Sequence, residues 1–378
     1  MQLKVTIHYL ALLPACLLMT SMLWAEEPRI PSISAVFTAT TLTTNKSQIT
    51  SDFLSSMDLV GVLPIGSGDL NVHVEGATTV GDNDVSAVIG ESNGDAGSAT
   101  DQDGNGRVQI SELFYALPLL NKGSISFGML DPTANLDTSD VANDETTQFL
   151  AGPLINNPTI AFPDYTIGLS LDAEPESMGF GYHLFLGSSH GLGDDINTSK
   201  YHRLLQLDQD GKGIFAAVEG VWKQHNLTTR FGVWLNSADN AHLDDADKTS
   251  KNYGFYGVLN GSMDTSTWGI RFGWSDPSVS EANWSLGAAV EHPVNGVGIL
   301  GIGLTYTIAS DNLQDDPDND FMAANNMVAE IYLRLDKLTE HLQITPLVQY
   351  IDNSGYNSAD TVPTDVWVFG TRFNVELP

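Results

Sequence analysis

The chain has 378 residues and a formal net charge of -31, from 16 Lys plus Arg against 47 Asp plus Glu. This charge argues against nucleic acid as a partner, because phosphate binding needs clustered cations. Cys16 is the only cysteine, so no disulfide can form within the chain and the fold must depend on packing or on closure of a sheet.

The first 25 residues have the layout of a secretory signal peptide. Lys4 supplies a positive charge, the run from Val5 to Trp24 is almost uncharged, and polarity changes abruptly after Ala25. We therefore expect residues 1–25 to be a signal peptide and residues 26–378 to form one domain. An uncleaved anchor and lipidation at Cys16 are the alternatives. No later run of 18 apolar residues offers a transmembrane helix, but barrel strands leave hydropathy near neutral.

The rest of the chain alternates apolar and polar residues in segments of about eight to eleven residues, which is typical of strands with one apolar face. In residues 227–236, for example, Phe231 and Val233 oppose Arg230 and Trp234. We expect sixteen strands: 33–40, 55–62, 68–76, 108–117, 123–130, 163–171, 178–187, 213–222, 227–235, 251–259, 265–274, 283–291, 299–309, 326–335, 341–350 and 365–375.

The connections between these strands sort by length. Those after even-numbered strands are short, whereas those after odd-numbered strands are long, and only 275–282 is close in length to the short class. This alternation is typical of a transmembrane up-and-down β-barrel with tight periplasmic turns and long external loops. The sequence thus predicts an all-β, antiparallel barrel of about 16 strands. A secreted β-sandwich would also have one apolar face, but its loops have no reason to sort in this way.

Residues 101–112 satisfy the twelve-residue pattern of a calcium-binding loop. Gly, Ser and Asn precede it and a strand follows, so the helices of an EF-hand are not expected. The alternative is an Asp/Gly-rich outer loop in which the last carboxylate faces the lumen. No cofactor is required, and calcium would act as a structural clamp. The predicted ligands are Asp101, Asp103, Asn105, the backbone carbonyl of Arg107, Gln109 and Glu112.

The block from residue 111 to residue 165 resembles the OprB-type carbohydrate-selective porins. Members of that family share a strand-turn-strand followed by an Asn-Asp-Glu…Phe-Leu…Asn-Asn-Pro…Phe-Pro loop. The matching segments here are Ser111–Tyr115, Phe127–Pro132, Ala142–Leu150 and Leu154–Tyr165.

The resemblance implies a sixteen-stranded barrel, often trimeric, in the outer membrane of a Gram-negative-type bacterium. It would let small neutral solutes such as monosaccharides pass without enzymatic activity. Loop 131–162 would fold inward and narrow the pore. A sugar pore needs polar groups for hydroxyls and aromatic faces for the ring. By alternation, the pore-lining candidates are Glu219, Arg230, Trp234, Arg271, Glu330, Arg334 and Arg372.

Three other functions are compatible with parts of the sequence. The acidic excess favours a general or cation-preferring diffusion porin. A barrel enzyme would need a catalytic constellation, which no motif marks. A secreted calcium-binding adhesion module would combine loop 101–112 with a β-sandwich.

Overall fold

The computed structural model describes residues 29–97, 99–101, 103–119, 123–175, 177–194, 198–205, 207, 212–316, 320–336, 339–359 and 363–377. The expected signal peptide, residues 1–25, lies outside the described residues. The barrel belongs to a compact unit that starts at Pro31. Among the described residues, no helix is long and apolar enough to cross a membrane.

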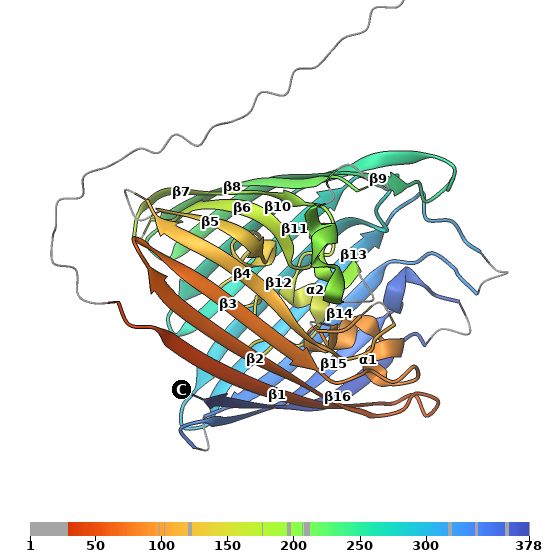
Figure 1. Ribbon diagram of the computed structural model, residues 1–378. Coiled ribbons are helices and arrows are strands. Elements are labelled where there is room, and N and C mark those ends of the chain that lie inside the picture. Colours follow the sequence, from red (N-terminus) through yellow and green to blue (C-terminus); the bar gives the residue numbers. More distant parts are fainter. Residues whose placement is uncertain are drawn as a thin grey trace, which may run out of the picture. The chain divides into compact units, whose positions relative to one another are not determined.

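The described part of the chain forms sixteen antiparallel strands that close into one barrel, with each strand paired to its neighbours in sequence and β1 paired to β16 (Figure 1). This confirms the predicted fold. The strands are β1 Ser32–Thr44, β2 Asp52–Ile65, β3 Gly68–Ala77, β4 Val108–Pro118, β5 Gly123–Leu130, β6 Thr166–Ala173, β7 Gly179–Ser188, β8 Ile214–Gln224, β9 Leu227–Ala241, β10 Thr249–Met263, β11 Ser266–Ser275, β12 Ala282–Val294, β13 Gly298–Ala309, β14 Asn326–Leu335, β15 Leu342–Asp352 and β16 Val366–Leu377.

Several predicted strand limits were wrong by three residues or more. The second strand was expected over 55–62 and the ninth over 227–235, whereas β2 covers Asp52–Ile65 and β9 covers Leu227–Ala241. The sixth strand was expected from residue 163, but β6 begins at Thr166. Pro163 has no backbone N–H for a ladder, and Tyr165 has a φ of 42°, in the left-handed region. The preceding connection therefore covers residues 131–165, and we call it the inward loop.

Short helices lie in the long loops. They are α1 Val85–Val88, η1 Gly90–Ser92, η2 Asp95–Gly97, η3 Pro132–Ala134, α2 Gly152–Ile155, η4 Leu192–Asp194, η5 Thr198–Leu205 and η7 Ser354–Tyr356. In Figure 1 the long loops gather at the right-hand end of the barrel and the short turns at the left-hand end. The long connections after odd-numbered strands and the short ones after even-numbered strands thus lie at opposite ends of the barrel (Figure 1).

Alternation along the strands sorts side chains between the outside and the inside of the barrel. On β9, Phe231, Val233 and Leu235 are 53%, 49% and 42% exposed, whereas Arg230 and Trp234 between them are buried. A soluble protein would not leave such a continuous apolar wall in water. This wall is the surface expected to face lipid.

The interior of the barrel contains a packed core to which two long loops contribute. Val85 and Ile89 from the loop between β3 and β4 join Phe149 and Leu150 of the inward loop, and all four pack in one cluster with strand residues such as Tyr332. Loops that fold into a barrel must bury apolar side chains there to be held in place. Residues of the two loops therefore pack against the inner wall of the barrel.

Candidate functional site

The seven pore-lining candidates are Glu219, Arg230, Trp234, Arg271, Glu330, Arg334 and Arg372. They lie on β8, β9, β11, β14 and β16, and six of them are buried. The seventh, Arg334, has a side chain that is 15% exposed. Five of the seven form hydrogen bonds with the backbone of the inward loop, so their polar groups hold this loop inside the barrel.

Arg271 on β11 binds the inward loop at four backbone carbonyls. Nη1 donates hydrogen bonds to Leu154 O (2.9 Å) and Ile155 O (2.8 Å). Nη2 donates to Asp137 O (2.8 Å) and Ala142 O (3.0 Å). The guanidinium Nε also lies 3.0 Å from Asp137 Oδ2. The five fixed N–H groups of a guanidinium allow one side chain to organise so many acceptors.

The middle of the inward loop is held by two other strands of the barrel wall, β14 and β16. Arg372 on β16 donates hydrogen bonds to Glu145 O (2.6 Å) and Gln148 O (2.8 Å). Arg334 on β14 donates to Thr147 O (2.5 Å). These charge-assisted bonds satisfy carbonyls that no helix or sheet pairs.

Glu330 on β14 binds the next part of the loop, but as an acceptor: its carboxylate binds backbone N–H groups, whereas the arginines bind carbonyls. Its Oε1 and Oε2 accept a hydrogen bond from Leu150 N at 2.9 and 3.0 Å, and Oε2 accepts another from Ala151 N at 2.8 Å. Gln349 Nε2 donates to the same carboxylate at 3.0 Å. The inward loop thus alternates between carbonyls bound by arginine and amides bound by glutamate.

The loop also has internal constraints. Asp131 accepts a hydrogen bond from Thr133 N at 2.8 Å, and Asp144 accepts one from Thr146 N at 2.8 Å. Burial by itself would raise the pKa of Asp144, but hydrogen bonds from Thr146 and Thr147 hold it below its usual range. Such Asx turns let the loop keep a compact shape without regular secondary structure.

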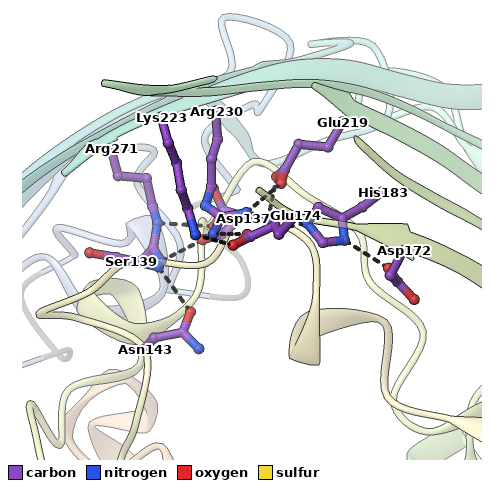
Figure 2. A network of polar contacts seen from close by, with 10 residues as sticks. All are labelled: Asp137, Ser139, Asn143, Asp172, Glu174, His183, Glu219, Lys223, Arg230 and Arg271. Carbon is purple, nitrogen blue, oxygen red and sulfur yellow. Dashed lines mark hydrogen bonds and ion pairs between the residues drawn. The ribbon is translucent and has the colours of Figure 1, made fainter. Parts of the chain in front are cut away.

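A network of charged side chains lies where the inward loop meets β7, β8 and β9 (Figure 2). Glu219 accepts hydrogen bonds from Asp137 N (2.9 Å) and Arg230 Nη1 (3.0 Å). Glu174 in the turn after β6 binds Arg230, Lys223 (2.5 Å) and His183 (3.3 Å).

The electrostatics of Glu174 follow from these contacts. The hydrogen bond from His183, together with Lys223 and Arg230, holds the pKa of Glu174 well below its usual range. The carboxylate therefore stays ionised, and it links the turn to the wall of β8 and β9. Asp137 differs from Glu174, because its burial raises its pKa to about 7 despite the guanidinium of Arg271.

Trp234 alone among the candidates packs mainly against apolar groups. Its ring stacks on Phe215 with centroids 6.2 Å apart and an interplanar angle of 22°. It belongs to a buried cluster that also contains Leu136 and Ile160 of the inward loop. Trp234 therefore helps to hold the inward loop by apolar packing between the loop and the barrel wall.

Several recesses adjoin the inward loop, and two of them are larger than the others. One has a volume of about 350 Å³ and a polar lining, and it lies between the inward loop and the short-turn end of the barrel. It is lined by Ser124, Ala134, Asn135, Thr138, Asp172, Glu174 and His183. The other, of about 620 Å³, is lined by residues of three long loops, 87–91, 152–160 and 354–355. Both recesses present hydroxyl, amide or carboxylate groups, which are suited to hydrated and hydroxylated solutes.

The six predicted calcium ligands do not converge. Asp101 Oδ1 accepts hydrogen bonds from Asp103 N and Asn105 N, both at 2.9 Å. Gln109 is buried in the barrel wall and accepts from Arg107 Nε at 2.7 Å. Glu112 Oε1 accepts from Asp131 N at 3.1 Å, so this carboxylate faces the lumen. Calcium binding by all six groups stays a prediction, and it would require Glu112 to leave the inward loop.

Reasoning from the sequence missed Asp137, Glu174 and His183. A single loop aspartate and a turn glutamate carry no pattern of their own. His183 does alternate with Tyr182 and Leu184 on β7, so its inward direction could have been predicted from strand periodicity. Its partners could not.

Comparisons with known proteins agree with this architecture. No protein-family model matches the chain. An uncharacterized protein of Aquifex aeolicus is 40% identical over 67 residues, which are 18% of this chain and 21% of that protein, so the match spans about a fifth of that relative's length.

Solved structures match over most of the chain. The high-pH structure of OprB from Pseudomonas putida aligns with a TM-score of 0.72 at 12% identity, over 92% of this chain and 94% of that one. The trimer form of OmpT, an outer membrane protein of Vibrio cholerae, gives 0.55 at 12% identity, over 92% and 99%. A double mutant of the porin of Rh. blastica gives 0.51 at 11% identity, over 91% and 100%.

At these identities the structural matches establish the fold. The chain has the fold of outer-membrane porins, and the resemblance to OprB that residues 111–165 indicated is confirmed at that level. The predicted closed antiparallel β-barrel is likewise confirmed, with an apolar outer wall and buried polar groups inside.

Proposed function

We propose that this chain is an outer-membrane porin through which small neutral solutes, most of all monosaccharides and similar carbohydrates, diffuse passively. The observation that carries the proposal is an inward loop held inside a closed barrel by five charged wall residues. A loop so placed narrows the passage and brings polar groups close to any solute that crosses. We expect no catalytic activity.

The carbohydrate part of the proposal is supported by the chemistry of the recess on the short-turn side. Ser124, Asn135 and Thr138 offer hydroxyl and amide groups, and Asp172 and Glu174 offer carboxylates. Sugar hydroxyls both donate and accept hydrogen bonds. A lining that contains donors and acceptors can therefore replace the water molecules that hydrate a sugar. The fold shared with OprB of Pseudomonas putida supports the same assignment.

A general or cation-preferring diffusion porin is the second candidate. The observation that favours it is the net charge of -31, since a negative potential raises the local concentration of cations. The secreted β-sandwich is ruled out by the closed sixteen-strand barrel. We also propose assembly as a homotrimer, a form in which OmpT of Vibrio cholerae is described.

Swelling of liposomes that contain the folded protein tests the proposal. Monosaccharides should enter rapidly, disaccharides more slowly and trisaccharides least, because the inward loop sets the width. Amino acids of similar size and zero net charge serve as the comparison solutes. Equal rates for sugars and amino acids would favour the general porin, and no swelling with any solute would overturn transport.

Reversal potentials under a KCl gradient test the charge preference separately. We expect potassium to be favoured over chloride, and more strongly at low salt because screening weakens the potential. Preference for chloride would contradict the expectation.

A further inference from the structure

A cluster of metal-ligating side chains lies on the inner face of β2 and β3, apart from the charged network of Figure 2. Asp58, His73 and Glu75 each offer a ligand atom, and these atoms lie within 4.8 Å of one another. Asp58 pairs with Glu75 across the two strands, and His73 is two residues from Glu75, so all three point to the same side. We propose that this cluster binds a divalent first-row transition metal ion, with Zn²⁺ as the representative.

The orientation of His73 has the form that metal-binding histidines take. Its Nε2 lies 3.0 Å from Asp58 Oδ1, whereas its Nδ1 faces Glu112 Oε2 at 3.6 Å. Metal-binding imidazoles commonly direct one nitrogen at the ion and the other at an outer carboxylate, which fixes the ring and raises its basicity. Here Asp58 lies on the ligand side and Glu112 on the outer side.

Glu75 is a buried carboxylate whose hydrogen-bond partners are neutral. It is 4% exposed and accepts hydrogen bonds from the Ser111 hydroxyl, from Tyr165 OH at 2.7 Å and from Gln109 Nε2 at 3.3 Å. Among the described residues, no Lys or Arg forms an ion pair with Asp58 or Glu75. Burying carboxylates without a cation is costly. The imidazole of His73 can supply one positive charge to Asp58 by binding a proton, whereas a divalent ion bound in place of that proton would supply two.

His183 also lies between two carboxylates, but there Lys and Arg side chains supply positive charge. His183 Nδ1 lies 2.7 Å from Asp172 Oδ1, and Nε2 lies 3.3 Å from Glu174 Oε1. There, however, Lys223 and Arg230 both pair with Glu174 (Figure 2). The contrast assigns the metal to His73 and makes His183 the matched control.

The donor set indicates which metals fit. One imidazole nitrogen with two carboxylates suits Zn²⁺, Co²⁺ or Mn²⁺. Ca²⁺ and Mg²⁺ prefer oxygen ligands alone, so the proposed site is distinct from the calcium pattern of residues 101–112. Glu112 belongs to that pattern in sequence but contacts His73 in space.

The site also touches both ends of the inward loop. Glu112 accepts the amide hydrogen of Asp131, where the loop begins. Glu75 accepts the hydroxyl hydrogen of Tyr165, where the loop ends. An ion held by Asp58, His73 and Glu75 would therefore stiffen both attachments and reduce the mobility of the loop.

Calorimetric titration of the full chain, folded in detergent and freed of metal with EDTA, tests the proposal with Zn²⁺. We expect one ion per chain, and Co²⁺ should give a visible absorption spectrum typical of nitrogen and oxygen ligands. His73→Gln and Asp58→Asn should each lower the affinity at least tenfold, whereas His183→Gln should leave it unchanged. Heat-modifiable migration in gels reports whether each variant is folded, and if His73→Gln does not fold, Asp58→Asn decides.

Three results would overturn the proposal. These are the absence of Zn²⁺ binding by the wild-type chain, unchanged affinity in the folded His73→Gln or Asp58→Asn variant, and equal loss of affinity in His183→Gln. Because the readout is metal binding, it is independent of whether sugars pass.

Discussion

The carboxylate of Glu330 on β14 accepts the amide hydrogen of Leu150 with both of its oxygens, at 2.9 and 3.0 Å. The two residues are 180 positions apart in the sequence. Their contact means that a wall residue expected to face solutes instead binds the backbone of the inward loop. The width of the passage therefore depends on hydrogen bonds between the wall and this loop.

Replacing Glu330 should loosen the inward loop. In Glu330→Ala the buried amides of Leu150 and Ala151 lose their acceptor, which costs about 1–3 kcal/mol for each unsatisfied group. Single-channel conductance should rise, and the urea midpoint should fall. The exposed Glu340→Ala variant is the control and should match the wild type. Unchanged conductance in Glu330→Ala would show that the loop does not depend on this carboxylate.

Arg271 should contribute more to the free energy of unfolding than an exposed cation does. Arg271→Met removes the donor to four loop carbonyls and leaves the Asp137 carboxylate without its partner, so we expect a loss of about 3–5 kcal/mol. Urea unfolding followed by tryptophan fluorescence measures the change. Lys248→Met, which removes an exposed pair with Asp245, should cost less than about 1 kcal/mol. Similar losses in both variants would contradict the assigned role.

The attachment of the loop should weaken as pH rises. Burial raises the pKa of Asp137 to about 7 and the pKa of Glu145 to about 8, above the values near 4 expected in the unfolded chain. The folded state then binds more protons than the unfolded state between these limits, so the free energy of unfolding falls as pH rises through them.

Urea unfolding at about pH 5 and about pH 9 measures this effect. The double variant Asp137→Asn with Glu145→Gln should show a smaller difference between the two pH values, whereas Asp247→Asn, at an exposed loop position, should not. A wild-type chain that is more stable at the higher pH would reverse the predicted sign.

Two inward glycines make room for buried tyrosine rings. A Cβ on Gly232 would lie 2.1 Å from Tyr256 Cζ, and one on Gly301 would lie 2.1 Å from Tyr332 Cε1. Gly232→Ala and Gly301→Ala should each destabilise the barrel by about 1–3 kcal/mol through overpacking. Gly61→Ala, where a Cβ meets nothing within 4 Å, is the matched control. Equal urea midpoints for all three would refute the packing argument.

Calcium binding by residues 101–112 should be weak. Asp101 already accepts two backbone amide hydrogens, and Glu112 is engaged by Asp131, so we expect a dissociation constant of about 0.1–1 mM, as in extracellular calcium modules. Calorimetry with Ca²⁺ measures it, and Asp103→Asn should weaken it further. Micromolar binding would mean that the loop rearranges around the ion.

Much of the fold could be predicted because its causes are local. Strand periodicity depends on the two-residue repeat of side-chain direction, so the inward position of Arg230 and the outward position of Phe231 follow from neighbours in sequence. The alternation of short and long connections then predicts which strands are neighbours, since each short turn joins adjacent antiparallel strands. The start of β6 was wrong by three residues because the left-handed φ of Tyr165 has no signature in residue type.

What the wall residues do was decided only by the tertiary structure. Sequence alone placed Arg271, Glu330 and Arg372 inside the barrel, where they were expected to face solutes. Each instead binds backbone groups of a loop more than a hundred residues away. No periodicity encodes such a contact, because it forms only when barrel closure brings distant strands around the loop, and buried backbone groups then require partners from whichever wall lies nearest.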